Sequence, residues 1–329
     1  MRRLLIICAL IAFVPLAPVA VFAADETFQA EATRFLSERA KADSSGVAVL
    51  VARDGKIVFQ DGFGLADIGN KTPITPDTKF RIGSVTKQFT AAAILRLAEQ
   101  GKLSLDDKLS KHFPDFSHRP DVTIRHLLTH TSGLHSYTDK PEFITRVTKP
   151  IEPAKLIDWF RGDSTDFSPG AGFHYNNSAY FLLGELVAKI SGKPYGDFLR
   201  ETFFQPLEMK SSGVYVNSSP PPGAATGYSL TEGKLKPALD WDMSWAGGAG
   251  ALYSTVGDLF RWNEALYGGR VLNAESLKAA ITPVELPKNV DGMKYGYGLM
   301  MYEMKYPENL RVMHYPVCPI EIGVMDNEH

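Results

Sequence analysis

Residues 80–95 read FRIGSVTKQFTAAAIL and place a serine hydroxyl and a lysine amine three residues apart, where a loop becomes a helix. Positions i and i+3 of a helix share one face, with Cβ atoms about 5–6 Å apart, so we expect the Lys87 amine to reach the Ser84 hydroxyl. A neutral amine in that position accepts the hydroxyl proton and makes the serine nucleophilic. The first turn of a helix also carries partial positive charge, which favours a nearby oxyanion. The same spacing occurs by chance in many helices, so other segments must support this interpretation.

The flanking sequence predicts a mixture of helices and strands. Residues 26–42 have apolar side chains at helical spacing, and residues 46–52 and 56–64 are β-type runs around an Asp54-Gly55 turn. The helix that follows the serine is expected to cover residues 84–100, with Gly101 as its stop and a buried stripe of Phe89, Ala92, Ala93 and Leu97. Further helices are expected at 124–129, 178–190, 195–203 and 254–267, and strands at 295–302 and 310–315.

This order of elements predicts an α/β (α+β) fold. We expect an antiparallel sheet flanked by helices and built from both ends of the chain, residues 24–105 and 241–329. A mainly helical lobe of about residues 106–240 is expected to be inserted between these two parts. The Ser-Ser-Pro-Pro-Pro-Gly run at 218–223 indicates a surface loop, and it is too short for a linker between independent domains.

The N-terminus has the pattern of an export signal. Arg2 and Arg3 precede an apolar run over residues 4–19, and Val21-Phe-Ala23 offers small residues for cleavage before Ala24. We therefore expect residues 1–23 to be removed and the protein to be periplasmic or secreted. The alternative is a retained N-terminal membrane anchor, because the apolar run is nearly long enough to span a bilayer.

Composition excludes several classes of function. Without residues 1–23 the chain of 329 residues has 33 basic and 37 acidic side chains, a balance that does not favour nucleic acid as a partner. Cys318 is then the only cysteine, so no intrachain disulfide can form. No cofactor is indicated. The glycine-rich run at 247–255 has neither phosphate-loop nor dinucleotide-binding spacing, so we expect close packing of its backbone near the pocket instead.

Two more segments place polar groups where they could serve chemistry. Tyr175 and Asn177 are two residues apart, so in an extended segment they point the same way, and a tyrosine hydroxyl near a lysine can share its proton. The alternative for Asn177 is the N-cap of the helix that follows. His126 and His130 are four apart, as in helix-borne zinc sites, but Leu127 replaces the glutamate of that motif. Structural hydrogen bonding under the active site is the better interpretation of these histidines, and no metal site is predicted.

Together these segments resemble the serine β-lactamase and penicillin-binding-protein superfamily. The resemblance covers about residues 46–316 and is specific to the class C β-lactamase/D-alanyl-D-alanine carboxypeptidase/esterase group. Ser-x-x-Lys is the nucleophile motif of the superfamily. Residues 101–107 (GKLSLDD), 124–134 (IRHLLTHTSGL) and 246–255 (AGGAGALYST) also resemble segments of the group, and Tyr175-Asn-Asn177 matches its Tyr-x-Asn motif.

The resemblance implies roles for these residues. Ser84 would be the acyl-accepting nucleophile, Lys87 its base or proton relay, Tyr175 a second general acid/base and Asn177 a substrate contact. The implied protein is a serine hydrolase that acts through an acyl-enzyme on a β-lactam, a D-Ala-D-Ala peptide or a simple ester. Its partners would be a small molecule or a peptidoglycan peptide, with no cofactor.

The chain departs from the group near its end. The third motif of the group is Lys or His, a small residue and Gly, whereas this sequence has His314-Tyr-Pro316. His314 fits as a substrate-binding residue, but proline is disfavoured inside a central strand. Residues 317–329 do not match the strands and helix that follow in relatives, so a truncated C-terminus is expected. The alternative function is therefore a catalytically impaired penicillin-binding-like protein that binds ligand without turnover.

Overall fold

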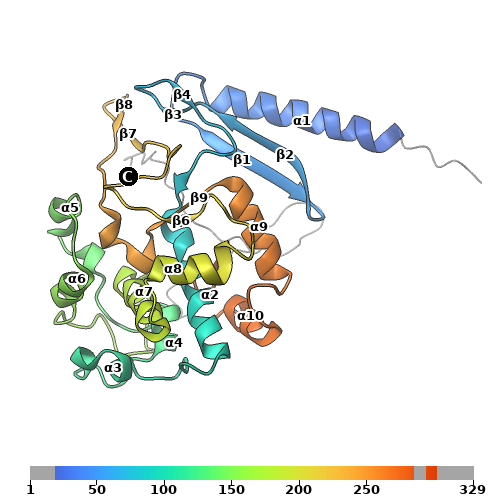
Figure 1. Ribbon diagram of the computed structural model, residues 1–329. Helices are drawn as coiled ribbons and strands as arrows, with labels where there is room; N and C mark the ends of the chain where they lie inside the picture. Colours follow the sequence, from blue (N-terminus) through green and yellow to red (C-terminus); the bar gives the residue numbers. More distant parts are fainter. Residues whose placement is uncertain (1–18, 285–293, 302–329) are drawn as a thin grey trace, which may run out of the picture.

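The computed structural model describes residues 19–284 and 294–301. Its first part is a helix packed on a β-hairpin. Asp54 and Gly55 have φ of 52° and 71°, the left-handed turn conformation that matches the twist of paired strands. The Phe28 ring meets the Phe59 ring edge-on at 6.4 Å and holds the helix on the hairpin. These elements are α1 (Val19–Arg39), β1 (Val47–Arg53) and β2 (Lys56–Phe63), and α1 lies across the hairpin in Figure 1.

A central helix, α2 (Thr86–Glu99), follows a short 3₁₀ turn, η1 (Gly83–Val85). The predicted stripe of Phe89, Ala92, Ala93 and Leu97 is buried, which confirms it, but α2 is buried on its other sides as well. The reason is visible in Figure 1, where α7 and α10 lie beside α2. The helix ends before Gly101, whose φ is 69°, as the sequence predicts.

A three-stranded antiparallel sheet connects distant parts of the chain. Its order is β5-β9-β6, with Phe80 opposite Ser254 and Gly213 opposite Tyr253. This register places the start of β9 beside the start of α2, because the Leu252 carbonyl accepts from the Ile82 N–H at 2.9 Å and the Leu252 N–H donates to Thr86 Oγ1 at 3.1 Å. The three strands are β5 (Phe80–Arg81), β6 (Gly213–Val214) and β9 (Leu252–Ser254).

Most of the elements between β5 and β9 are helices. The longest of them, α7 (Asn177–Ser191), begins at the N-cap Asn176, whose side chain accepts from the Ala179 N–H at 2.8 Å, and ends at Gly192 with φ of 70°. The others are α3 (Leu109–His112), η2 (Pro114–Phe116), α4 (Ile124–Leu128), η3 (Tyr137–Asp139), α5 (Phe143–Arg146), α6 (Pro153–Phe160), α8 (Tyr195–Leu199) and a π-helical turn, η4 (Arg200–Phe204).

The remaining described elements are short except for α9, whose N-cap Thr255 accepts from the Asp258 N–H at 3.2 Å. The prediction of one strand over 295–302 is wrong in the part that the structure describes. Gly298, with φ of 73°, turns the chain there and makes a hairpin of two strands. These elements are β3 (Leu65–Asp67), β4 (Thr72–Pro73), β7 (Tyr228–Thr231), β8 (Lys234–Pro237), η5 (Met243–Trp245), η6 (Gly247–Ala249), α9 (Val256–Tyr267), α10 (Ala274–Ile281), β10 (Lys294–Tyr295) and β11 (Met300–Met301).

Several expectations lie outside the described residues. They are the strand at 310–315, the C-terminal end beyond it and most of the export signal at 1–23. Among the helices within residues 19–284 and 294–301, none combines the length and apolar character needed to cross a bilayer.

Candidate active site

Ser84 and Lys87 lie at the start of the central helix. Ser84 sits in η1 and is half-buried, and Lys87 is one turn further along with only 1% of its surface exposed. The Lys87 Nζ atom is 3.0 Å from the Ser84 Oγ atom, so the predicted contact of amine and hydroxyl is confirmed. Gly83 has φ of 47° and allows the chain to turn sharply just before the serine.

Two oxygen atoms from distant segments hold the lysine amine. Nζ donates to Asn177 Oδ1 at 2.9 Å and to the Ala249 carbonyl at 2.8 Å. Both oxygens can only accept hydrogen bonds. A neutral amine that gives its two N–H groups to these acceptors directs its lone pair to the third partner, the Ser84 hydroxyl. The arrangement therefore suits Lys87 to receive the hydroxyl proton.

Asn177 is fixed from its other side. Its Nδ2 atom donates to Thr138 Oγ1 at 3.1 Å, and its backbone N–H donates to Ser136 Oγ at 3.1 Å. Because its amide oxygen bonds to Lys87, Asn177 is not the N-cap of α7. That alternative is wrong, since the neighbouring Asn176 fills the N-cap position.

Tyr175 lies against both the lysine and a buried histidine. The Lys87 Nζ atom is 4.7 Å from the centre of the Tyr175 ring, and the His130 ring centre is 4.5 Å from it. The structure thus brings Ser84, Lys87, Tyr175 and Asn177 together. His314, the other predicted substrate-binding residue, lies outside the described residues.

His130 is a structural support of this centre. It is 1% exposed and has φ of 58°, a left-handed conformation that is uncommon outside glycine. Its Nδ1 atom accepts from the Asn176 N–H at 3.0 Å, so Nε2 carries the proton and donates to the Tyr295 hydroxyl at 2.8 Å. Burial, with the charges of Lys87 and His174, holds the pKa of His130 well below its usual value. A neutral ring with this tautomer satisfies both neighbours.

His126, unlike His130, caps the start of a helix. Its backbone N–H donates to Thr123 Oγ1 and its Nδ1 accepts from the Thr123 N–H, each at 3.3 Å, which closes a capping box at the start of α4. In the described part of the chain, no group of three or more His, Cys, Asp or Glu side chains is arranged to hold a metal ion.

The sequence interpretation missed the Ala249 carbonyl and Thr138. Ala249 belongs to the glycine-rich run, and that run does pack closely, as the sequence suggested: a Cβ atom on Gly248 would lie 2.7 Å from the Gly184 Cα atom. The sequence thus indicated that the run containing Ala249 packs closely, but it did not indicate that the Ala249 carbonyl holds Lys87. Thr138 gave no signal, because a threonine in a loop is ordinary.

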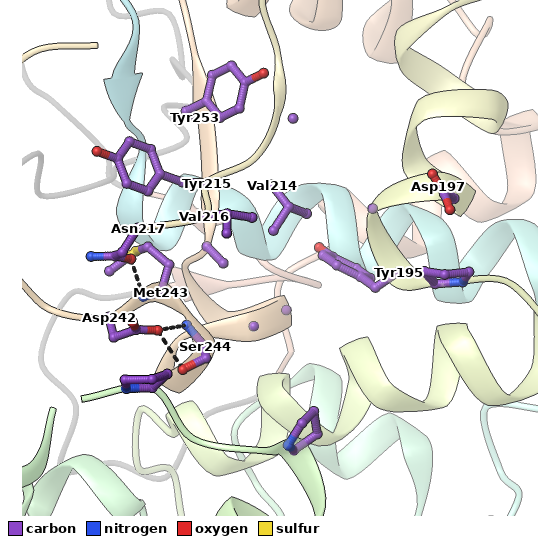
Figure 2. A pocket seen from close by; sticks show the side chains of 18 of the residues that line it. Tyr195, Asp197, Val214, Tyr215, Val216, Asn217, Asp242, Met243, Ser244 and Tyr253 are labelled. Atoms are coloured by element: carbon purple, nitrogen blue, oxygen red, sulfur yellow. Dashed lines mark hydrogen bonds between the residues drawn. The ribbon is translucent and has the colours of Figure 1, made fainter. Parts of the chain in front are cut away.

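A cavity of about 720 Å³ lies beside this centre but does not include it. Figure 2 shows part of its lining, from α8, β6 and the η5 segment. Gly247 and Gly248 of η6 also line it. Ser84, Lys87 and Tyr175 do not, so the cavity and the candidate active site lie beside each other along η6.

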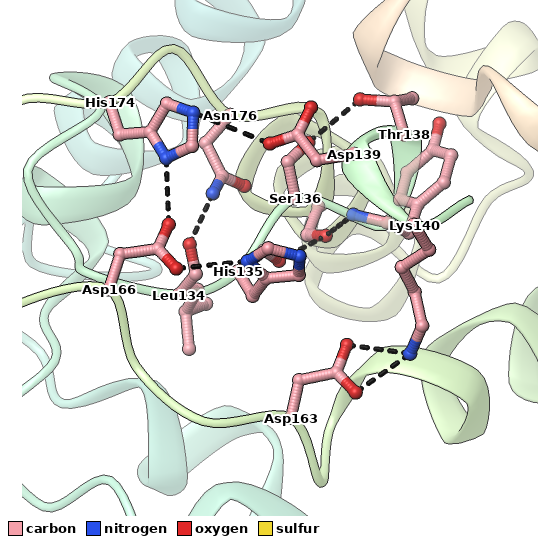
Figure 3. A network of polar contacts seen from close by, with 12 residues as sticks. Leu134, His135, Ser136, Thr138, Asp139, Lys140, Asp163, Asp166, His174 and Asn176 are labelled. Atoms are coloured by element: carbon pink, nitrogen blue, oxygen red, sulfur yellow. Dashed lines mark hydrogen bonds and ion pairs between the residues drawn. The ribbon is translucent and has the colours of Figure 1, made fainter.

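A second polar network braces the segment that leads into Tyr175. Figure 3 shows Asp166 between two histidines, with His135 Nδ1 at 2.9 Å and His174 Nδ1 at 2.7 Å from its two oxygens. Asp139 lies 3.3 Å from the other nitrogen of His174. Burial opposes ionisation of Asp166, but the hydrogen bonds from the two histidines outweigh it and lower its pKa. The network fixes residues 166–174 against the segment 135–139, which includes η3.

Comparison with known proteins shows which proteins have a similar sequence and fold. The chain is 32% identical to a penicillin-binding protein from Bacillus halodurans, whose structure covers 82% of this chain and 83% of its own with a TM-score of 0.74. It is 28% identical to a D-amino acid amidase from Ochrobactrum anthropi SV3, over 90% of this chain and 85% of that one, also with a TM-score of 0.74. It is 32% identical over 283 residues to penicillin-binding protein 4* of Bacillus subtilis strain 168, covering 80% of this chain.

The fold, with a Ser-x-x-Lys segment at the start of its central helix, defines a protein of the β-lactamase/transpeptidase type. The family model described as Beta-lactamase matches residues 32–314, and the chain belongs to that family. It spans 61% of the length of the B. subtilis relative and 44% of that of the protein flp of Staphylococcus aureus strain MRSA252.

Proposed function

We propose that this protein is a serine hydrolase that cleaves an amide or an ester through an acyl-enzyme on Ser84. The observation that carries the proposal is the position of the Lys87 amine. It lies 3.0 Å from the serine oxygen and is held there by two acceptors from α7 and η6. The names of the relatives, penicillin-binding proteins and a D-amino acid amidase, support the same chemistry.

In the first step the Ser84 Oγ atom attacks the substrate carbonyl carbon while its proton moves to Lys87 Nζ. The carbonyl oxygen becomes an oxyanion. The Ser84 N–H lies in the first turn at η1, where such groups have no partner within the helix, and we assign it as one oxyanion donor. The oxyanion then collapses, the bond to the amine or alcohol breaks, and the leaving group takes a proton through Lys87 and Tyr175.

In the second step water attacks the acyl carbon and gives a proton to the same relay. The acid product leaves and Ser84 regains its hydrogen. Asn177 accepts from Lys87 with its Oδ1 atom and donates to Thr138 with its Nδ2 atom, so in this reaction it positions the lysine. The resemblance to the Tyr-x-Asn motif implies that it also contacts the substrate. No cofactor takes part in either step.

Covalent labelling tests the nucleophile. A fluorescent fluorophosphonate or a fluorescent penicillin should label the protein once, and mass spectrometry should place the label on the peptide that contains Ser84. Ser84→Ala should lose the label, whereas Ser117→Ala, which changes an exposed serine, should keep it. Label that persists in folded Ser84→Ala would contradict the assignment.

Turnover measurements test Lys87 as the base and distinguish a hydrolase from a protein that binds ligand without turnover. With D-phenylalanine amide, a p-nitrophenyl ester and a chromogenic β-lactam as substrates, Lys87→Ala should lower kcat by about 10³-fold to 10⁶-fold. Lys102→Ala, on the surface, should not change it. A protein that labels on Ser84 but turns over no substrate of the panel would instead be the penicillin-binding-like protein without turnover.

We also propose that the chain is exported, as its N-terminal pattern predicts, and that residues 24–105 and 241–329 form one lobe with about 106–240 as the other. Expression of the full chain in a bacterium with an outer membrane, followed by fractionation, tests the first point. The protein should be periplasmic and start at Ala24. Removal of residues 2–23 should keep it in the cytoplasm.

A further inference from the structure

The cavity beside the candidate active site has walls from several parts of the chain. They are the start of α6 with the loop before it, α7 and α8, the segment that contains β6, η5 with η6, and β9. Its volume of about 720 Å³ lies in the range of about 300–1,000 Å³ that is typical of small-molecule sites. Most of the lining is apolar or aromatic, and includes Phe181, Tyr195, Val214, Val216, Met243 and Tyr253.

The charges that face this cavity are mainly negative. Glu185 of α7 and Asp242 before η5 are both half-buried, and within residues 19–284 and 294–301 neither forms an ion pair. Asp242 accepts from the N–H and the hydroxyl of Ser244, as Figure 2 shows. Glu185, in contrast, accepts no hydrogen bond from any residue that the structure describes. The basic residue of the lining, Arg200, is paired with Asp197 and Glu201. A bound cation would therefore meet uncompensated carboxylate.

We propose that this cavity binds a small organic amine, with its ammonium on Glu185 and an aromatic or branched apolar body against Phe181, Val214 and Met243. Burial without a compensating partner raises the pKa of Glu185, and an ammonium beside it would relieve that cost. Aromatic rings at Tyr195 and Tyr253 offer further faces for a cation. An anionic ligand would meet repulsion from the same side chains.

The site is separate from Ser84 but shares a wall with it. The Tyr195 hydroxyl is 2.6 Å from Thr90 Oγ1, which donates to the Gly248 carbonyl at 2.7 Å. The next carbonyl, that of Ala249, holds Lys87. The inference does not depend on the proposed hydrolase activity, because it rests on the lining of this cavity alone.

Calorimetric titration with 2-(1-naphthyl)ethylammonium tests the proposal. We expect saturable binding of one molecule, with the neutral 2-(1-naphthyl)ethanol and the anionic 3-(1-naphthyl)propanoate weaker. Glu185→Gln should weaken binding of the amine by about 10-fold to 100-fold, because it removes the charged acceptor. Glu264→Gln, which changes an exposed acid of α9 outside the lining, is the matched control and should leave binding unchanged.

Two more variants separate binding in this cavity from binding at the Ser84 centre. Val216→Trp changes an exposed side chain at the cavity and should block binding while the circular dichroism spectrum and Tm stay as in the unmodified protein. Ser84→Ala should bind the amine with unchanged affinity. The proposal is overturned if the unmodified protein shows no saturable binding, if Glu185→Gln and Val216→Trp both bind normally, or if Ser84→Ala abolishes binding.

Discussion

At the residue scale, the site depends on groups that direct one amine. The spacing of Ser84 and Lys87 was readable in the sequence, because neighbours on one helix face meet whatever the rest of the chain does. The Ala249 carbonyl could not be read there, since every residue has a carbonyl and only the tertiary fold selects one. The choice between Asn176 and Asn177 as N-cap was equally open, because either side chain can cap a helix.

Asn177 offers a prediction about the lysine. Asn177→Asp keeps an acceptor near Lys87 but adds a negative charge, which stabilises the ammonium form of the amine. A higher pH is then needed for Lys87 to accept a proton, so we expect the pH–rate profile of kcat/KM to move to higher pH. Asn177→Ala should lower activity by about 10-fold to 100-fold without that shift. An unshifted profile in Asn177→Asp would mean that the residue does not act through Lys87.

His130 predicts how stability responds to acid. Its pKa is lowered in the folded protein, so between about pH 6.5 and that lowered value the unfolded chain binds a proton that the native chain does not. This contribution to the free energy of unfolding is present above about pH 6.5 and decreases by about 1.4 kcal/mol per pH unit below it.

Urea unfolding between pH 7.5 and 5.0 measures this slope. His130→Asn suits the comparison, because asparagine tolerates positive φ and does not titrate. The variant should be less stable at pH 7.5. The pH slope of its free energy of unfolding should be smaller by about one proton, which corresponds to about 1.4 kcal/mol per pH unit. Equal slopes for the two proteins would show that His130 is protonated in the native state.

At the scale of elements, a close backbone contact near the site joins α7 to η6. A Cβ atom on Gly184 would lie 2.9 Å from the Gly248 Cα and N atoms, so the two backbones touch without side chains between them. The glycine-rich run was correctly expected to pack closely, but its partner helix could not be predicted. The prediction of one strand over 295–302 was wrong for a related reason. Gly298 forms a turn that lies close to the Lys87 carbonyl, and its partner could not be read from the sequence.

Gly184→Ala should therefore push η6 away from α7. Alanine favours a helix over glycine by about 1 kcal/mol, but the contact with backbone outweighs this gain, and we expect a loss of stability of about 1–3 kcal/mol. Activity should fall too, because η6 carries the carbonyl that holds Lys87. Gly162→Ala is the control, since a Cβ atom there meets nothing within 4 Å. A Gly184→Ala protein as stable and active as this control would contradict the packing.

At the scale of the whole molecule, one hydrophobic core connects the sequence-distant parts. The Phe89 ring of α2 lies 4.0 Å from the Trp262 ring of α9, and the Trp262 indole N–H donates to Gln88 at 2.7 Å. The same core continues through α7 to Tyr137 and Phe160. The sequence predicted the classes of element, but not that two proposed lobes would share one core, because apolar spacing shows which face is buried and not against what.

We therefore expect the protein to unfold as one unit. Two of the four tryptophans, Trp159 and Trp245, pack on each other among the helices between β5 and β9, while Trp262 lies on α9. Urea transitions followed by tryptophan fluorescence and by far-UV circular dichroism should coincide, as in a two-state transition. Transitions with separate midpoints would show that the helical part unfolds on its own.

The distances along the chain between Lys87 and its partners have a consequence for synthesis. Ser84 is three residues from Lys87, but Asn177 is 90 and Ala249 is 162 residues further on. A ribosome therefore makes Ser84 and Lys87 early and the groups that hold the lysine amine much later. In the reaction that we propose, Ser84 is consequently not activated until the glycine-rich segment has left the ribosome and docked against α7.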